Sequence, residues 1–507
     1  MIYCIGNNLG KKIPGIEHSQ IKRINLFSQL GEKAKIVTLD YNSALYENAE
    51  LFLIADNIFS MYDYFQESVG NNVYSREDYH RKWQNNSNYH IEYVPNTTDI
   101  KVFYQEEYIC YAHFFDNRYQ RISYINYFDG PYETRRKVKR EIYDARGFLS
   151  NVKILGEKQQ VLTESYYSPS GEEKIVCYYN FKQELSRIQL LNYKNECFYF
   201  KNKNDWQAFF LDEINQEDVL FFSDRTQSVI ESVTLMKTKA KLIPVIHNVH
   251  LRAPFEPKTS EITSPYQELF NQLDYTTALV ASTTHQAEEL NQRLPENVKA
   301  YPIPVGYIKE IKQVTFKKRN PYKLICMARY YSEKQLLHQI KIVEELLPKF
   351  PKLELHLFGY GDATDNFKEE KMLKSYVKKN QLEKHVFFRG YLTDLESEYN
   401  NAGAMLLTSS IEGFCLSLLE AVEHGVPVIS YDIRYGPSEI IEDGKNGYLI
   451  KKNDKSQMKE KLDKLLSHPE LQNEMSNNAY EVAKKFNQEN IKKKWQQLLE
   501  NEKGLTK

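Results

Sequence analysis

Short apolar runs separated by amphipathic stretches recur along most of this 507-residue chain, and one long segment interrupts them. Near the amino terminus, residues 1–6 and 34–39 are apolar, and residues 16–30 place apolar side chains at helical spacing. Strands that alternate with helices in this way form a parallel sheet covered by helices. The length fits two or three domains, each large enough to bury its own core. The pattern therefore predicts an α/β chain.

The interrupting segment, residues 75–205, has a different period and a different composition. Tyr and Phe alternate with other residues, and turn signals stand at residues 129–131, 144–147 and 168–171. Residues 101–200 contain 14 of the 38 tyrosines, so about a fifth of the chain holds more than a third of them. We predict an antiparallel β-meander inserted into the first domain, with its aromatic side chains in a core or a subunit interface.

The α/β pattern returns at residue 206 and continues into a helical, charged tail. Lys317 to Pro321 indicate a linker between two α/β domains. Strands are predicted in the first domain at 219–222, 242–246 and 278–281, and in the second at 323–327, 353–358, 386–388, 404–408 and 427–430. The predicted domains are a Rossmann-like domain of residues 1–74 and 206–316, the insert 75–205, a second Rossmann-like domain 317–485 and a C-terminal helix 486–507.

Charge and cysteine usage exclude several classes of protein. The 67 Lys and Arg face 68 Asp and Glu for a formal charge of −1, so a large basic face for nucleic acid is not expected. The six cysteines form no CxxC pair and no zinc spacing, which is typical of reduced thiols in a cytosol. The start resembles no signal peptide, and no run of about 18 apolar residues occurs. We expect a cytoplasmic protein that binds no nucleic acid.

The motif with the most chemical content lies at residues 409–420, Ser-Ser-Ile-Glu-Gly-Phe-Cys-Leu-Ser-Leu-Leu-Glu. Glu412 follows an apolar run, so we expect it at the carboxyl end of a strand, where open α/β sheets bind ligands. The amides of Cys415, Leu416 and Ser417 would then begin a helix and suit a phosphate group. Two surface glutamates, Glu412 and Glu420, beside an ordinary strand-to-helix turn would give the same spacing, and the spacing alone leaves this alternative open.

With its surroundings, the motif resembles the family-four retaining glycosyltransferases, which use nucleotide-sugar donors. The resemblance is strongest over residues 320–450, and it includes Arg329 and Lys334 after the first strand of the second domain. It implies the GT-B fold, in which two Rossmann-like domains face each other, here with the antiparallel β-meander inserted in the first.

The same resemblance implies a role for each matching residue. Glu412 would hold donor-sugar hydroxyls and Glu420 the ribose, while Arg329 and Lys334 would neutralise the departing nucleoside diphosphate. His247 would lie near the donor sugar. The predicted catalytic residues are therefore Glu412, Arg329, Lys334 and His247. The predicted donor-binding residues are Gly15, Ile16, Arg329, Lys334, Gly390, Tyr391, Glu412, Gly413, Phe414, Cys415, Leu416, Ser417 and Glu420.

Two features of the sequence distinguish the predicted diphosphate site from one that uses a metal ion and from one built of backbone amides alone. No Asp-x-Asp triplet occurs, which metal-dependent transferases use to hold Mg²⁺ or Mn²⁺, so we expect no metal and no cofactor besides the UDP-sugar. Arg329, Lys334 and the helix start after Glu412 would supply the positive charge instead. The family's glycine-rich first turn is reduced here to the single Gly15, which weakens any role for backbone amides alone on that side.

The turn at Pro14 and Gly15, residues 61–65, the Tyr-rich insert and residues 431–440 resemble a subgroup of Gram-positive bacterial enzymes that glycosylate surface polymers. One branch adds N-acetylglucosamine to serines of Ser-rich or Ser-Asp-repeat adhesins, and this is the activity we expect. Decoration of wall teichoic acid with glucose or N-acetylglucosamine is the alternative. An inactive acceptor-binding partner subunit is a third possibility, against which the joint presence of Arg329, Lys334, Glu412 and Glu420 argues.

Residues 135–140, Arg-Arg-Lys-Val-Lys-Arg, give the insert local positive charge on both faces of a strand. A solvated edge strand that blocks aggregation is one explanation. A docking strip for an acidic Ser-repeat polypeptide or a polyol-phosphate polymer is the other. The possible acceptor residues are His250, Arg135, Arg136, Lys139 and Arg140. Because a meander leaves edges to be covered, we also expect a homodimer through the insert.

Overall fold

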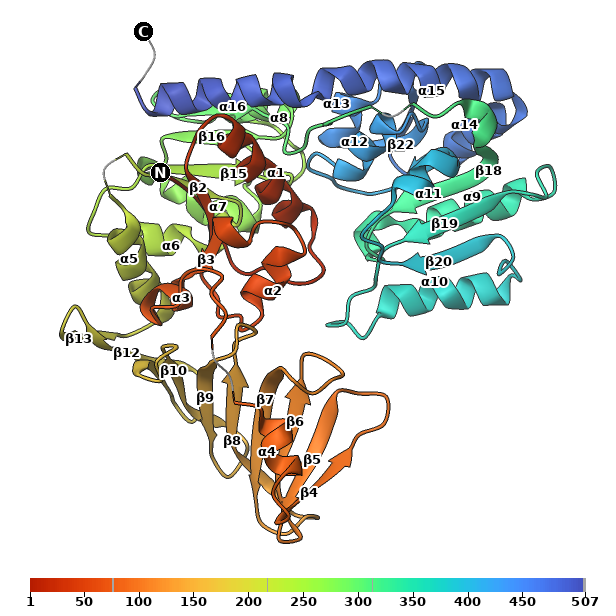
Figure 1. Cartoon of the computed structure of the whole chain (residues 1–507). Coiled ribbons are helices and arrows are strands. Elements are labelled where there is room, and N and C mark those ends of the chain that lie inside the picture. The colour runs from red at the N-terminus through yellow and green to blue at the C-terminus, as the bar shows by residue number, and fades with distance from the viewer. Residues whose placement is uncertain (75–76, 217, 312, 505–507) are drawn as a thin grey trace. The chain divides into compact units, whose positions relative to one another are not determined.

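The computed structural model describes residues 1–74, 77–216, 218–311 and 313–504 (Figure 1). It divides into two compact units. Met1–Ile24, Gly31–Leu242 and Asn271–Tyr275 form the first unit, and Asn25–Leu30, Ile243–Phe270 and Thr276–Lys507 form the second. Within the described ranges we find no helix that combines the length and the apolar character needed to cross a bilayer.

The first unit begins with parallel strands in the order β14-β1-β2-β3. Their bounds are β1 (Ile2–Gly6), β2 (Ala34–Thr38), β3 (Ile58–Ser60) and β14 (Leu220–Ser223). Apolar side chains such as Ile5, Val37 and Phe222 are buried, as expected of strands with helices on both faces. The helices that begin in this unit are α1 (Gly15–Gln29), α2 (Leu45–Glu50), α3 (Met61–Phe65), α5 (Lys203–Ile214) and α6 (Ile230–Thr234).

The predicted meander is confirmed as a ten-stranded antiparallel sheet in which each strand pairs with the next, from β4 to β13. The three predicted turns join β7 to β8, β8 to β9 and β10 to β11. Helix α4 (Tyr79–Gln84) lies on one face, where Trp83 packs with Val102 and Ile125 (Figure 1). The strands are β4 (Tyr89–Tyr93), β5 (Asp99–Tyr104), β6 (Glu107–Phe114), β7 (Ile122–Asp129), β8 (Arg136–Tyr143), β9 (Leu149–Leu155), β10 (Val161–Tyr167), β11 (Glu173–Tyr179), β12 (Leu185–Tyr193) and β13 (Glu196–Phe200).

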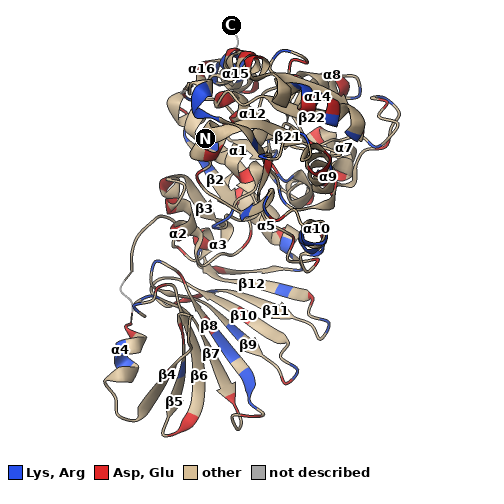
Figure 2. Ribbon diagram, turned by 90° about the vertical axis from the view of Figure 1, so that its right-hand side faces the viewer, with Lys and Arg blue, Asp and Glu red and all other residues tan. Residues whose placement is uncertain are grey.

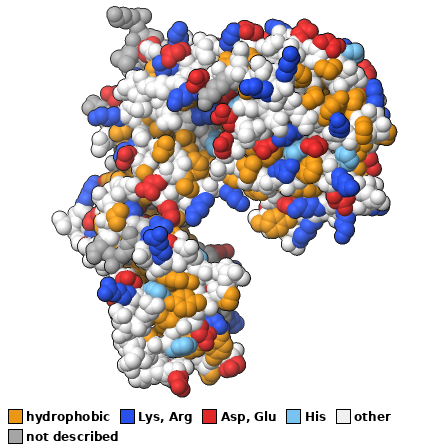
Figure 3. Space-filling view, turned by 45° about the vertical axis from the view of Figure 1, so that its right-hand side comes forward, with side chains coloured by type: hydrophobic (Ala, Val, Ile, Leu, Met, Phe, Trp, Pro, Cys, Tyr) orange, Lys and Arg blue, Asp and Glu red, His pale blue; other side chains and the backbone are white. Residues whose placement is uncertain are grey.

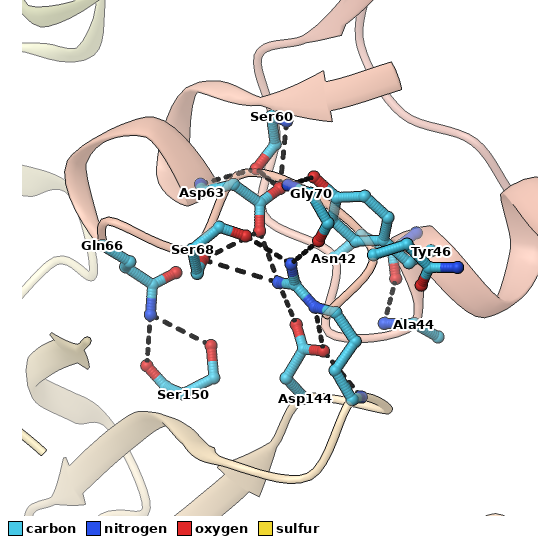
Figure 4. A network of polar contacts seen from close by, with 12 residues as sticks. Asn42, Ala44, Tyr46, Ser60, Asp63, Gln66, Ser68, Gly70, Asp144 and Ser150 are labelled. Carbon is cyan, nitrogen blue, oxygen red and sulfur yellow. Dashed lines mark hydrogen bonds and ion pairs between the residues drawn. The ribbon is translucent and has the colours of Figure 1, made fainter. Parts of the chain in front are cut away.

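A buried polar network attaches this insert to the α/β part of the first unit (Figure 4). The Arg146 guanidinium donates to Asp63 Oδ1 at 2.7 Å and to Asp144 Oδ1 at 2.8 Å, and its side chain is only 3% exposed. The same guanidinium donates to the Gly70 carbonyl at 2.7 Å. Gln66 adds a bond from Nε2 to the Ser150 carbonyl at 3.0 Å. The turn after β8 is therefore held by α3 and the segment that follows it.

Aromatic packing accompanies this network and accounts for part of the tyrosine excess. The Tyr166 ring lies 4.8 Å from that of Tyr62 and 5.0 Å from that of Tyr41, and Tyr62 contacts Trp206. Other hydrophobic side chains, counting tyrosine among them, remain on the surface that the insert forms (Figure 3). The predicted core role is confirmed for these buried rings, whereas the predicted homodimer stays a prediction.

The second unit contains two parallel strand groups. The first has β16 between β15 and β17. The second is a six-stranded sheet in the order β20-β19-β18-β21-β22-β23. The strands are β15 (Leu242–Ile246), β16 (Ala278–Ala281), β17 (Lys299–Pro302), β18 (Asn320–Met327), β19 (Glu354–Phe358), β20 (Val386–Gly390), β21 (Ala402–Leu407), β22 (Val428–Asp432) and β23 (Gly447–Lys451).

Helices connect these strands and end the chain. They are α7 (Ser264–Asn271), α8 (Thr284–Asn291), α9 (Leu336–Leu346), α10 (Lys368–Lys379), α11 (Glu396–Asn401), α12 (Leu416–Glu423), α13 (Gly436–Ile440), α14 (Lys455–Ser467), α15 (Pro469–Ala483) and α16 (Gln488–Glu502). In a parallel sheet the loops after the strands meet at one edge. The loops after β18, β20 and β21 carry Arg329 and Lys334, Tyr391, and Glu412, respectively.

Candidate functional site

An ion pair joins two of the four predicted charged residues, in the loops after strands of the six-stranded sheet. Lys334 Nζ lies 2.7 Å from Glu412 Oε1, and both side chains are 14% exposed. Ser409 Oγ donates to the same oxygen at 2.6 Å. Burial acts to lower the pKa of Lys334, but the charge and the hydrogen bond of Glu412 outweigh it and raise that pKa. The structure thus keeps a charged lysine and a carboxylate together at the carboxyl edge of the sheet.

The backbone around Lys334 is fixed to the loop that carries Glu412. Thr408 Oγ1 donates to the Lys334 carbonyl at 2.9 Å, and the Ser410 amide donates to the Glu333 carbonyl at 2.7 Å. Gln339 Nε2 in turn donates to Thr408 Oγ1 at 2.9 Å. Two loops that follow neighbouring strands, β18 and β21, are therefore bonded through both side chains and backbone.

Gly413 brings His247 beside this loop. A Cβ atom at Gly413 would lie 1.9 Å from the His247 carbonyl oxygen, so only glycine permits the observed approach. The His247 amide donates to Tyr266 Oη at 3.2 Å, which holds the segment after β15. The structure therefore brings His247, Glu412 and Lys334, which sequence reasoning grouped, into one site.

Helix α12 begins at Leu416, as predicted, directly after the Glu412 turn. Cys415 adopts a left-handed conformation with φ of 68°, and its Sγ lies 3.3 Å from Ser417 Oγ. Burial raises the pKa of the Cys415 thiol to about 12, so this group stays protonated at neutral pH. Phe414 is buried and packs against Phe486. The part of these residues in binding phosphate stays a prediction.

Glu420 faces a cavity further along α12. Tyr399 Oη donates to Glu420 Oε2 at 2.9 Å, and the Tyr399 ring stacks on His424 at 5.1 Å. The cavity has a volume of about 480 Å³ and is lined by Lys309, Glu310, Thr393, Leu395, Glu396, Tyr399, Glu420, Glu423 and His424. A space of this size beside a carboxylate has room for a small polar group, and the ribose contact that the resemblance implies for Glu420 stays a prediction.

Gly390 is the last residue of strand β20, and Tyr391 is the first residue of the loop that follows it. Gly390 has a positive φ of 75°, and its carbonyl accepts from the Gly359 amide at 2.9 Å. The Tyr391 ring contacts Tyr360 at 5.8 Å. Thr393, two residues on, lines the cavity, and the donor contact assigned to Gly390 and Tyr391 stays a prediction.

Arg329 lies in the loop after β18, and its side chain is 42% exposed. Its guanidinium lies over the Tyr331 ring at 4.2 Å and 3.7 Å from Glu333 Oε1. Gly15 and Ile16, in the first unit, begin α1, where Ser19 Oγ donates to the Ile16 carbonyl at 2.7 Å. The diphosphate contacts assigned to these three residues stay predictions.

His250 differs from its predicted place at an acceptor surface. Its side chain is fully buried, between Phe270 and Tyr435, and burial lowers its pKa to about 4. The prediction that His250 contacts the acceptor is therefore wrong, because its side chain is not at the surface in this structure. A single histidine after a strand gives no sign in sequence of the two rings that enclose it.

The position of the basic residues 135–140 differs from one of the two explanations offered for them. Strand β8 pairs with β7 on one side and β9 on the other, so it is an interior strand and not the solvated edge strand (Figure 2). Arg135 lies over the Tyr132 ring at 4.0 Å, Arg140 over Tyr124 at 4.0 Å and Lys139 over Tyr127 at 4.2 Å. Arg136 is exposed and pairs in register with Asp129. Aromatic neighbours thus accommodate charge in the middle of the sheet.

Sequence reasoning missed Ser409, Thr408, Tyr399 and Gln339, which orient the charged groups. Ser409 precedes Glu412 by three residues, a spacing that a side-chain bond across a tight turn favours, so it could have been found. Gln339, on α9, binds the hydroxyl of Thr408, and Tyr399, on α11, binds the carboxylate of Glu420. Both partners are distant in the sequence, so no local pattern indicates these contacts.

The family Glycosyl transferases group 1 matches residues 308–482. A Streptococcus pneumoniae protein, named UDP-N-acetylglucosamine--peptide N-acetylglucosaminyltransferase GtfA subunit, is 24% identical over 98% of this chain and 99% of its own length. The poly(glycerol-phosphate) alpha-glucosyltransferase of Bacillus subtilis is 25% identical over 74% of this chain, and the chain spans only 55% of that relative.

A solved structure matches the whole chain. The crystal structure of the pneumococcal O-GlcNAc transferase GtfA, in complex with UDP and GlcNAc, covers 99% of this chain and 98% of its own with a TM-score of 0.85 at 21% identity. This likeness confirms the predicted GT-B fold. The family match contains Arg329, Lys334, Tyr391, Glu412 and Glu420. Residues 308–482 are therefore a domain of the glycosyl transferases group 1 family.

Proposed function

We propose that this chain is a retaining glycosyltransferase that moves N-acetylglucosamine from UDP-GlcNAc to serine hydroxyls of a Ser-rich or Ser-Asp-repeat surface polypeptide. The observation that carries this proposal is the Lys334–Glu412 ion pair at the carboxyl edge of the group 1 domain, next to His247. The pneumococcal relative, named for peptide N-acetylglucosamine transfer, matches over nearly the full length of both chains and supports the choice of sugar and acceptor.

The arrangement fits a transfer in which negative charge develops on the departing nucleoside diphosphate. The bond between the sugar's anomeric carbon and the diphosphate oxygen breaks, and a bond from the serine oxygen forms on the same face. The serine proton goes to the departing phosphate, so no side chain is needed as a base. Lys334, with its raised pKa, and Arg329 would face the developing negative charge, where a fixed cation is worth most.

In this proposal Glu412 and Glu420 bind different parts of the donor. Glu412 Oε1 already accepts from Lys334 and Ser409, so its position is set before a sugar arrives. Glu420, with Tyr399 on its Oε2, would receive the ribose hydroxyls in the adjoining cavity. Preorganised carboxylates lose little entropy when a ligand binds.

The insert would hold the acceptor polymer, and one observation favours a second acceptor. Arg135, Lys139 and Arg140 combine cationic groups with tyrosine rings on an interior strand. Cations of this kind suit a polyol-phosphate chain as well as an acidic polypeptide. The Bacillus subtilis relative is named for poly(glycerol-phosphate), so teichoic acid is the second candidate. The ion pair and the two carboxylates argue against an inactive partner subunit.

Incubation of the full chain with labelled UDP-GlcNAc and UDP-glucose tests the proposal. Each donor is offered with a Ser-Asp-repeat peptide and, separately, with poly(glycerol phosphate). We expect label from UDP-GlcNAc on the peptide, and no label with the Glu412→Gln variant, which should still bind UDP. Label only on the polyol-phosphate would favour the second acceptor. Absence of UDP binding by the wild-type chain would contradict the enzyme assignment.

A further inference from the structure

A fully buried tyrosine, Tyr435, lies between the segment that carries His247 and the loop that carries Glu412. Its Oη donates to Glu289 Oε2 at 2.7 Å and lies 3.3 Å from His250 Nδ1. The Glu289 side chain, on α8, is only 6% exposed. Its other oxygen, Oε1, accepts from the Arg434 guanidinium. A buried carboxylate is thus satisfied by the two neighbouring residues of one loop.

The hydrogen bonds of this group have a definite direction. Tyr435 gives its only proton to Glu289, so the contact with His250 is one in which Nδ1–H donates and Tyr435 Oη accepts. Gln286 Nε2 lies further from Nδ1, at 3.5 Å, and donates to the Asn248 carbonyl at 2.8 Å instead. His250 Nε2, buried and without a partner among the described residues, then carries the lone pair of a neutral ring. The chain of donors runs from His250 to Tyr435 to Glu289.

The backbone of the same tyrosine binds Glu412. The Tyr435 amide donates to the Glu412 carbonyl at 2.9 Å, and the Glu412 amide donates to the Arg434 carbonyl at 3.3 Å. A Cβ atom at Gly436 would lie 2.1 Å from the Phe414 carbonyl oxygen, so the two loops also touch one residue further on. Tyr435 therefore contacts α8 and His250 with its side chain and the Glu412 turn with its backbone.

Lys334 fixes the Glu412 carboxylate relative to the loop after β18, and Ser409 fixes it within its own loop, but neither side-chain bond reaches the segment of His247. The contacts of Tyr435 supply that second constraint, because His250 and His247 follow the same strand, β15. The plain alternative is a polar cluster that stabilises the fold without affecting the site. The two explanations differ in what should happen to Glu412 when the Tyr435 hydroxyl is removed.

We propose that Tyr435, held by Glu289 and His250, is a positioning residue that sets where Glu412 lies beside His247, and hence where the donor sugar is held. This inference rests on the proposed function, since its consequence is sugar transfer. Tyr435 itself contacts no atom of the UDP-sugar. It acts through its hydrogen bond to the backbone of Glu412.

Tyr435→Phe tests the proposal, with Tyr166→Phe as a matched control. Tyr166 is buried in the insert and donates to Glu164 at 2.7 Å, so both variants lose one buried Tyr–Glu hydrogen bond of the same length. We expect kcat of Tyr435→Phe to fall about 10- to 100-fold, as a small displacement of a reacting group can cause. Its Kd for UDP should change less than about twofold, because the Glu420 cavity is untouched. Tyr166→Phe should keep the wild-type kcat.

Hydrogen exchange gives a measure that needs no turnover. The peptide spanning residues 409–417 should exchange at least about tenfold faster in Tyr435→Phe than in the wild-type chain, while that spanning 336–346 should not change. Glu289→Gln, whose amide oxygen still accepts from Tyr435, should keep about half of kcat or more, whereas Glu289→Ala should resemble Tyr435→Phe. These two variants also decide the matter if Tyr435→Phe does not fold.

Two results would overturn the inference. One is wild-type exchange of residues 409–417 in both Tyr435→Phe and Glu289→Ala. The other is an equal fall of kcat in Tyr166→Phe. A wild-type chain that transfers no sugar would instead contradict the proposed function, and exchange together with UDP binding would still test the positioning of Glu412.

Discussion

Lys334 and Glu412 are 78 residues apart in the sequence, and Nζ of one lies 2.7 Å from Oε1 of the other. The pair joins the loop after β18 to the loop after β21. In the proposed reaction a diphosphate would share Lys334 with Glu412, and the donor sugar beside it would lie within reach of the same carboxylate.

Replacing Lys334 with Ala should lower kcat about 100-fold, because one fixed cation on a developing anion is lost. Arg329→Ala should have a similar effect. The measurement is release of labelled UDP under saturating donor. Lys323→Ala is the matched control, since it removes a Lys–Glu pair, with Glu398, from strand β18, which precedes the loop of Lys334. Wild-type turnover in Lys334→Ala, with the control also active, would refute the assignment.

Gly413→Ala should separate the Glu412 turn from His247, because the new Cβ would lie 1.9 Å from a backbone oxygen that cannot rotate away. We expect a loss of stability of about 1–3 kcal/mol, as for other overpacked sites, and a larger relative loss of kcat. Gly10→Ala, where the nearest atom would lie at an ordinary 3.4 Å, should stay within about 0.5 kcal/mol of wild type. Urea unfolding of both variants checks the comparison.

The stability of the chain should fall as pH drops from about 6.5 to about 4, because of His250. Burial lowers the pKa of this imidazole to about 4, an effect that Glu289 opposes and that Arg293 and Arg434 reinforce. In this interval the unfolded chain binds the proton and the folded chain does not, so stability is lost at up to about 1.4 kcal/mol per pH unit.

Thermal unfolding between pH 7 and pH 4.5 measures this slope. His250→Gln should reduce it. An unchanged slope in His250→Gln would show that other groups take up the proton.

Removal of the basic side chains around β8 should weaken acceptor binding without affecting the donor. Arg135, Arg136, Lys139 and Arg140 changed together to Ala should raise the acceptor KM and flatten its dependence on salt, while hydrolysis of UDP-GlcNAc stays constant. Lys158→Ala with Lys182→Ala removes exposed charge elsewhere on the insert and is the control. Unchanged acceptor kinetics in the fourfold variant would exclude β8 as the docking strip.

Chelation should not inhibit the reaction. We expect turnover in excess EDTA to equal that in added Mg²⁺ or Mn²⁺, since Lys334 and Arg329 are proposed to take the place of a metal at the diphosphate. Activity assays across a series of divalent cations measure this. Loss of turnover in EDTA, restored by one cation, would require a metal site that involves other residues.

Strands with a strong local signal were predicted well from sequence. Continuous apolar runs gave the bounds of β15 and β16 as the structure has them, because both strands are buried on each face. Strands β3, β17 and β23 were missed: β3 has three residues, β17 ends in Pro302, and β23 is a five-residue strand at the edge of its sheet. Short strands of this kind depend on neighbours that the local sequence does not contain.

The candidate site divides in the same way. Glu412 and Glu420 belong to a motif of fixed spacing, and the family resemblance added Lys334, which forms an ion pair with Glu412 in the structure. Tyr435 and Glu289 are 146 residues apart and share no pattern, and only the folded chain brings them together. For β8 the sequence was misleading, because six residues with five charges look like an edge, whereas tyrosines on the neighbouring strand provide partners in the interior.

The Arg146 network sets a rule for exchanging modules between related proteins. Its donor lies in the turn after β8 and its acceptors include Asp63, outside the sheet. A chimera that received another protein's sheet without an arginine at this turn would leave the buried Asp63 carboxylate without its guanidinium partner. Grafts of acceptor specificity should therefore transfer this arginine and both aspartates as one unit.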